Sequence, residues 1–223
     1  MSTKNSIHKL TIRGFKSIKH LDEFYLDQLN ILIGANGAGK SNFVSYFRML
    51  NEMVESRLQS WTRNQGSADR IVSFGIKETD KVESFVEFGL NGYKFALEPT
   101  VDGGFSFYEE KLFFDGPYYG KKWIPLGSGH TEAKLKETFK TAKPGGVADY
   151  CYNSIANWKV FHFHDTSDTA GVKRLGSLHD NEYLRPDASN LAAFLYRLSG
   201  EYEDVYKQIQ KTICLAIPFF DDF

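Results

Sequence analysis

Cysteine and surplus charge are scarce in this sequence, and each shortage excludes a class of protein. The 223 residues include two cysteines, Cys151 and Cys214, which form neither a CxxC pair nor a zinc-ligand spacing. This scarcity excludes a disulfide-stabilised scaffold and indicates free thiols in a reducing compartment. The formal net charge of −1 provides no general attraction to nucleic acid or to an anionic membrane, so a DNA contact would need a local patch.

Long apolar runs are missing as well. No run approaches the roughly 18 residues that a transmembrane helix needs, and the first ten residues, MSTKNSIHKL, lack the apolar core of a secretory signal. With 42% hydrophobic and 25% charged residues, the composition is typical of a globular chain that has one large core, or a core with an appended lobe. We therefore expect a cytoplasmic protein without a membrane partner.

The N-terminal part shows strand and helix patterns in turn. Ile7, Leu10 and Ile12 follow the two-residue period of a strand with one slip, between Ile7 and Leu10. Residues 29–33 are mostly apolar, which predicts a strand buried on both faces of a parallel or mixed sheet. Apolar side chains then recur at steps of three and four, and this spacing predicts a helix over about 41–59.

The middle of the chain changes in character. Residues 70–115 are rich in Phe, Val and Tyr and contain two turn signals, LNGY and VDGG, which predict an antiparallel meander. Residues 116–150 are rich in Gly, Lys and Pro and favour an exposed connection.

A strand and two helices are expected in residues 151–223. The stretch NWKVFHFHD predicts the strand. The first helix is expected to be capped by Asp187 or Ser189 and to end at Gly200, and the second to run from 201 to about 216.

The strongest chemical signal lies between the predicted buried strand and the first helix. The pattern G-x-x-x-x-G-K-[ST] is satisfied there by Gly34, Ala35, Asn36, Gly37, Ala38, Gly39, Lys40 and Ser41. Glycines let successive backbone N–H groups point at phosphate oxygens, and the helix N-terminus adds partial positive charge. Lys40 would reach the β and γ phosphates of ATP, and the Ser41 hydroxyl would bind Mg²⁺. The alternative is a glycine-rich turn that binds nothing.

A phosphate-binding loop is shared by several enzyme classes, so other motifs have to discriminate between them. A GTPase would carry DxxG and NKxD motifs; residues 168–171, DTAG, match the first, but no NKxD follows. A small-molecule kinase usually begins almost directly with the strand before its loop, whereas some 28 residues precede that strand here. Both classes are therefore less favoured.

The flanks of the loop carry a resemblance to a known family. The GFKS element at residues 14–17, the loop itself and the following Asn42 resemble the N-terminal region of RecF/SMC-like ABC-type ATPases, a group that includes old-nuclease-like and AAA-type ATPases of bacterial DNA repair and phage defence. Later segments look like those that lead to the signature motif of that group. The resemblance thus covers essentially the whole chain, and it is specific at the loop.

The resemblance implies an α/β fold of the ABC-ATPase head type, with a mixed central sheet beside an antiparallel β subdomain. Residues 1–223 would form the N-terminal portion of one head. Its parts would be a phosphate-loop core at 1–60, the β subdomain at 70–115, a variable connection at 116–150, and a strand with a helical segment at 151–223. In the family, two heads sandwich ATP and Mg²⁺, which implies a homodimer that acts on DNA, with a nuclease or other effector as a further partner.

Two stretches resemble the remaining catalytic motifs of the family, but we interpret both as coincidences. Residues 198–201, LSGE, end a predicted helix, whereas a signature motif opens one. Residues 215–222, LAIPFFDD, place Pro218 inside a would-be central strand, and one residue follows Asp222. We therefore expect an incomplete N-terminal half without a convincing signature or Walker B motif.

Weaker candidates remain near the end of the strand predicted around residue 160. His162 and His164 share one side of that strand, but no further metal ligands are identifiable, so neutral structural histidines are the default interpretation. Asp165 or Thr166 stands where the family places a glutamine that contacts magnesium and water. Asp165 is accordingly the one catalytic candidate, and a weak one.

Basic residues outside the loop offer two further hypotheses. Lys16 and Ser17 would approach the ribose or the phosphates by resemblance, although an exposed turn lysine is an equal alternative. A set of lysines in the connection could meet DNA phosphates, although acidic neighbours favour a solvated surface instead; the set comprises Lys121, Lys122, Lys134, Lys136, Lys140 and Lys143.

The sequence therefore predicts the ATP-binding portion of a RecF/SMC-like ATPase. Two alternatives stay open: a non-hydrolysing, nucleotide-dependent assembly module for a partner such as a nuclease, and a P-loop kinase.

Overall fold

The computed structural model describes residues 6–118, 120–161, 167 and 169–223. The chain divides into two compact units, Met1–Trp158 and Lys159–Phe223. The first unit contains a sheet and four α-helices, and the second contains two α-helices. The phosphate-binding motif belongs to the first unit.

A six-stranded sheet organises the first unit. Its spatial order is β2-β1-β3-β4-β5-β6, and every neighbouring pair is antiparallel. The prediction of an antiparallel meander over 70–115 is confirmed, whereas the prediction of a mixed central sheet is wrong. The strands are β1 (Lys9–Phe15), β2 (Ile18–Tyr25), β3 (Val82–Phe88), β4 (Asn91–Pro99), β5 (Phe105–Gly116) and β6 (Gly120–Gly127).

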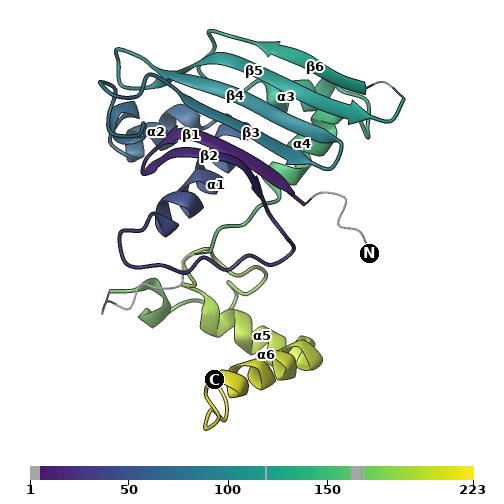
Figure 1. Ribbon diagram of the computed structural model, residues 1–223. Helices are drawn as coiled ribbons and strands as arrows, with labels where there is room; N and C mark the ends of the chain where they lie inside the picture. The colour runs from purple at the N-terminus through teal and green to yellow at the C-terminus, as the bar shows by residue number, and fades with distance from the viewer. Residues whose placement is uncertain (1–5, 119, 162–166, 168) are drawn as a thin grey trace. The chain divides into compact units, whose positions relative to one another are not determined.

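Helices α1 to α4 lie on one face of this sheet (Figure 1). They are α1 (Lys40–Val54), α2 (Leu58–Asn64), α3 (Leu135–Thr141) and α4 (Val147–Ala156), and a short 3₁₀ turn, η1, spans Ala68–Arg70. The single helix predicted over 41–59 is two helices, because Ser56 adopts a φ of 59° and interrupts the first. The connection predicted over 116–150 contains β6, α3 and the first four residues of α4.

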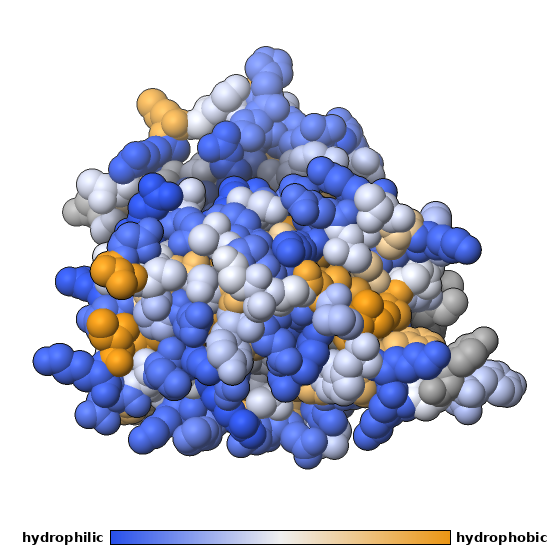
Figure 2. Space-filling view, turned by 90° about the horizontal axis from the view of Figure 1, so that it is seen from above, coloured by the Kyte–Doolittle hydropathy of each residue, from blue (hydrophilic) through white to orange (hydrophobic). Residues whose placement is uncertain are grey.

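The core lies between the sheet and these helices. Leu10 and Ile12 alternate with less buried neighbours along β1 and are fully buried, as the two-residue period predicts. From α1, Tyr46 packs edge-to-face on Phe15, with ring centroids 5.7 Å apart. The Tyr46 hydroxyl bonds the hydroxyl of Ser84 in β3, so α1 is attached to the sheet by both apolar and polar contacts. Seen from above, the molecular surface is mainly hydrophilic, with small apolar patches (Figure 2).

The segment between β2 and α1 departs most from expectation. Residues 29–33 form no strand, so the prediction of a doubly buried strand is wrong. Their apolar side chains are exposed, by 78% at Leu29, 74% at Ile31, 42% at Leu32 and 91% at Ile33. The physical reason is that no strand among the described residues lies beside this segment to pair with its backbone.

The second unit contains a 3₁₀ turn η2 (Gly171–Lys173) and the helices α5 (Leu191–Glu201) and α6 (Glu203–Ala216). The predicted cap of α5 is wrong, because Asn190 occupies the N-cap position. Its Oδ1 accepts from the Arg185 backbone N–H, and its Nδ2 donates to two carbonyls of the preceding loop. Gly200 does not end α5, since the helix continues to Glu201.

The second predicted helix is confirmed by α6. Residues 157–161, the described part of the NWKVFHFHD strand prediction, are not a strand. Within the described residues, no helix is both long enough and apolar enough to cross a membrane.

Candidate phosphate-binding site

The loop before α1 has the backbone geometry that its glycines predict. Gly37 and Gly39 have φ values of 85° and 91°, a region in which residues with a Cβ are strained. Gly39 is also the N-cap of α1. A Cβ on Gly39 would lie 2.8 Å from the Ser17 hydroxyl oxygen, so this position needs glycine for two reasons.

The N-terminus of α1 is left open to an anion. It has no side-chain cap hydrogen bond and no acidic residue in its first turn. Its first backbone N–H groups and its dipole are therefore not compensated by a carboxylate of the helix itself. Oxygens of a phosphate group are the ligands that such a terminus binds best.

Lys40 is folded back onto the loop. Its ammonium donates hydrogen bonds to the carbonyl oxygens of Gly34, at 2.6 Å, and Ala35, at 2.7 Å. These contacts curl residues 34–40 around a single cation. A phosphate group would compete for the same donors, because an ionised oxygen forms stronger hydrogen bonds with ammonium than a carbonyl does.

The structure brings several of the predicted site residues together. The Asn42 side chain donates to the Ser17 hydroxyl at 2.8 Å, and this hydroxyl also lies against Gly39. Ser41 is exposed at the start of α1. The GFKS element and the loop are therefore structural neighbours, although they are separated by some 20 residues in the sequence.

Lys16 points to the helices behind the loop. Its ammonium donates to the hydroxyl of Ser45, at 2.8 Å, and to Oε1 of Gln65, at 3.0 Å. Burial lowers the pKa of Lys16, with a further contribution from the nearby charge of Arg48. The predicted contact of Lys16 with ribose or phosphate stays a prediction, and Lys16 would have to exchange these partners to make it. The sequence did not reveal Ser45 and Gln65, since no motif contains them.

The remaining candidates lie away from this loop or outside the description. His162, His164, Asp165 and Thr166 lie outside the described residues. In the described part of the chain, no group of three His, Cys, Asp or Glu side chains is arranged to hold a metal ion.

The two stretches interpreted as coincidences have ordinary structural roles. Residues 198–201 form the last turn of α5. Residues 217–222 follow α6 without forming a strand, and the Asp222 carboxylate accepts hydrogen bonds from Tyr206 and Gln210. The interpretation of both stretches as coincidences stays a prediction.

Comparison with known proteins adds a family to this geometry. Residues 29–168, which are 140 of the 223 residues, match the family described as "AAA domain, putative AbiEii toxin, Type IV TA system". The match begins just before the phosphate-binding loop and includes the whole of it. Among curated proteins, none matches the sequence significantly.

Proposed function

The chain belongs to this AAA-domain family, and from that premise we propose that it binds ATP with Mg²⁺ through residues 34–41. The observation that carries the proposal is the open N-terminus of α1. It follows Gly37 and Gly39, which have positive φ values, and its first residue is Lys40. This combination presents several N–H donors and one ammonium group to the same small volume. A triphosphate tail supplies the matching oxygens.

Each loop residue has a distinct role in this proposal. The backbone N–H groups from Gly37 to Ser41 would hold phosphate oxygens, and Lys40 would exchange the carbonyls of Gly34 and Ala35 for the β and γ phosphates. The exposed Ser41 hydroxyl fits as a magnesium ligand, since Mg²⁺ prefers oxygen. When bound, the metal would neutralise charge that develops on the phosphates.

We further propose that two copies associate when ATP is bound and that the assembly acts on DNA, in the manner of RecF/SMC-like heads. The GFKS element supports this finer proposal, because Ser17 packs against the loop and would respond to an occupied site. Lys40 and the backbone amides neutralise charge but do not orient an attacking water. We therefore expect turnover to depend on association.

Steady-state ATP turnover, with and without duplex DNA, tests the proposal. Lys40→Ala is expected to lower turnover by about 100-fold or more, because it removes the ammonium that stabilises phosphate charge. Lys211→Ala is the matched control, since Lys211 is exposed on α6 and far from the motif in sequence. Equal rates in wild type and Lys40→Ala would contradict the ATPase proposal.

Light scattering on the same samples distinguishes an ATPase that associates from a non-hydrolysing assembly module. A mass that doubles with Mg²⁺ and ATP, without turnover, would favour the non-hydrolysing assembly module. Turnover without any change in mass would contradict the association step.

A further inference from the structure

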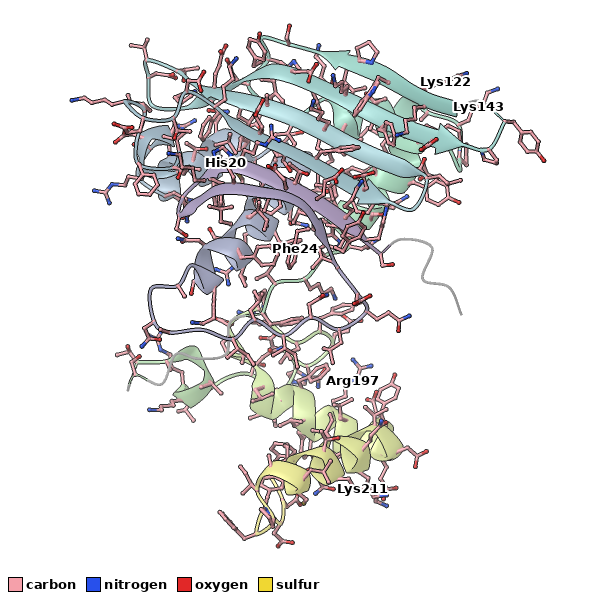
Figure 3. The ribbon with its side chains drawn as sticks, in the orientation of Figure 1. His20, Phe24, Lys122, Lys143, Arg197 and Lys211 are labelled. Carbon is pink, nitrogen blue, oxygen red and sulfur yellow. The ribbon has the colours of Figure 1, made fainter. Side chains whose placement is uncertain are left out.

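The turn between β1 and β2 has a backbone conformation that its sequence does not favour. Phe15 and Ile18 are register partners, so the two residues between them form a tight hairpin turn. His20 lies just beyond this turn on β2 and is labelled in Figure 3. The favoured turns of this length have a positive φ at their first position, where glycine fits best. Lys16 occupies that position with a φ of 48°, which is strained for a residue with a Cβ. Contacts outside the turn must therefore offset the strain.

The ammonium group of Lys16 makes such contacts with both of the first two helices. It donates to the hydroxyl of Ser45 in α1 and to Oε1 of Gln65, the C-cap residue of α2. It also lies 5.8 Å from the ring centroid of Phe15 and 5.8 Å from that of Trp61, within the range of cation–π attraction. One side chain thus attaches the turn to α1 and to α2.

The second residue of the turn, Ser17, lies against the first turn of α1. Its hydroxyl oxygen accepts from Nδ2 of Asn42 at 2.8 Å, and a Cβ on Gly39 would lie 2.8 Å from the same oxygen. Gly39 is the N-cap of α1, and Asn42 is the third residue of the helix. A shift of the turn would therefore move Ser17 relative to the backbone N–H groups that are proposed to hold phosphate.

We propose that Lys16 is a positioning residue for ATP: its ammonium, held by Ser45 and Gln65, fixes Ser17 beside the loop and does not itself contact the phosphates. This inference rests on the proposed binding of ATP at residues 34–41. To reach a phosphate, the ammonium would have to leave two hydrogen-bond acceptors and two aromatic rings, and each lost contact costs free energy. The affinity for ATP then depends on Gln65, although this residue lies outside the loop.

Gln65→Ala distinguishes a positioning role of Lys16 from a direct phosphate contact. Calorimetric titration of the full chain with ATP and Mg²⁺ measures the affinity. If Lys16 positions the turn, Gln65→Ala is expected to weaken ATP binding by about tenfold, because the ammonium loses an acceptor that holds it. If Lys16 contacts phosphate directly, the same change releases the ammonium, and ATP binds at least as tightly as to the parent. That second result would overturn the proposal.

A double-mutant cycle tests whether the two residues act through one contact. Lys16→Met keeps the apolar stem, removes the ammonium and is expected to weaken ATP binding by about tenfold. Adding Gln65→Ala to Lys16→Met is expected to cause no further loss, because the contact is already absent. A double variant that binds about 100-fold more weakly than the parent would show independent roles and overturn the proposal. If Lys16→Met fails to fold, Lys16→Gly replaces it, since glycine fits the positive φ.

A conservative variant and two controls complete the experiment. Gln65→Glu keeps an acceptor for the ammonium and is expected to bind ATP within about twofold of the parent. Gln208→Ala and Lys211→Met, at exposed positions of α6, are expected to leave the affinity unchanged. Urea unfolding of each variant shows that it is folded. No binding to the parent would overturn the proposed function and this inference with it. Binding to the parent that Gln65→Ala leaves unchanged would overturn this inference alone.

Discussion

Residues 29–33 are richer in apolar side chains than strand β1, yet they are far more exposed. In β1, Leu10 and Ile12 are fully buried between two neighbouring strands and α1. In residues 29–33, Leu29 and Ile33 are more than three-quarters exposed, and no strand pairs with them among the described residues. Apolar composition alone therefore does not decide burial. A strand also needs a neighbour for its backbone and a layer for its side chains.

This difference bears directly on the phosphate-binding loop, because the loop connects the exposed residues 29–33 to the well-packed helix α1. On one side, α1 is anchored in the core through Tyr46 and Met49, and Ser17 contacts Gly39 and Asn42. On the other side, the apolar side chains of residues 29–33 are exposed, and the Asn30 side chain bonds only locally, to the backbone of Asp27. We infer that α1 and the GFKS element hold the loop, and that the preceding segment contributes little.

The largest expected effect is a contrast in stability between the two regions. Phe15→Ala removes a fully buried ring that packs on Tyr46, and we expect it to lower the free energy of unfolding by about 3–5 kcal/mol. Ile31→Ala truncates an exposed side chain, so we expect a change within about 0.5 kcal/mol. Urea unfolding of both variants measures the contrast. A loss of more than about 2 kcal/mol for Ile31→Ala would mean that residues 29–33 are packed in solution.

A smaller effect on stability is expected at the C-terminal end of α1, where Glu55 connects this helix to α3 and α4. Its carboxylate accepts hydrogen bonds from the Lys136 ammonium, at 2.6 Å, and from the Tyr152 hydroxyl, at 2.6 Å. Burial by itself raises the pKa of Glu55, but the hydrogen bonds and charges of these partners outweigh it and lower the pKa below its ordinary value of 4.5. The ionised form therefore stabilises the folded state.

The sign of the pH dependence follows from this lowered pKa. The contribution of Glu55 is fully present above pH 4.5 and is lost as the pH falls through the pKa in the folded protein. Glu55→Gln is expected to cost about 1–2 kcal/mol at pH 7 and less at pH 4. Urea unfolding at both pH values gives this difference. A cost that grows on acidification would show that the carboxylate is not stabilised by its partners.

The sequence predicted the positions of strands and helices better than it predicted which segments pair in the sheet. A period-two pattern located β1, and the Phe, Val and Tyr content with two turn signals located the meander of β3 to β5. Helical spacing of apolar side chains located α1 and α6. The break at Ser56 and the strand β6 were missed. Neither a left-handed turn at serine nor a strand that contains two lysines and Pro125 has a strong local signal. Whether a strand pairs with residues 29–33 depends on distant parts of the chain. Their apolar sequence alone therefore predicted more burial than the structure shows.

In the candidate site, too, the local motif was predictable and the contacts between distant residues were not. The loop was predictable residue by residue, because its spacing encodes a backbone conformation that glycine permits. The family resemblance singled out Ser17 and Asn42 but did not predict the contact between them, and the engagement of Lys16 by Ser45 and Gln65 had no sequence signal.

The most direct test of the central claim is calorimetric titration of the full chain with ATP and Mg²⁺. We expect saturable binding to the wild-type protein and to Lys211→Ala, and binding weakened by about 100-fold or more for Lys40→Ala, because only the last variant removes the ammonium of the phosphate-binding loop. The absence of saturable binding to folded wild-type protein, or equal affinity in Lys40→Ala, would contradict the account.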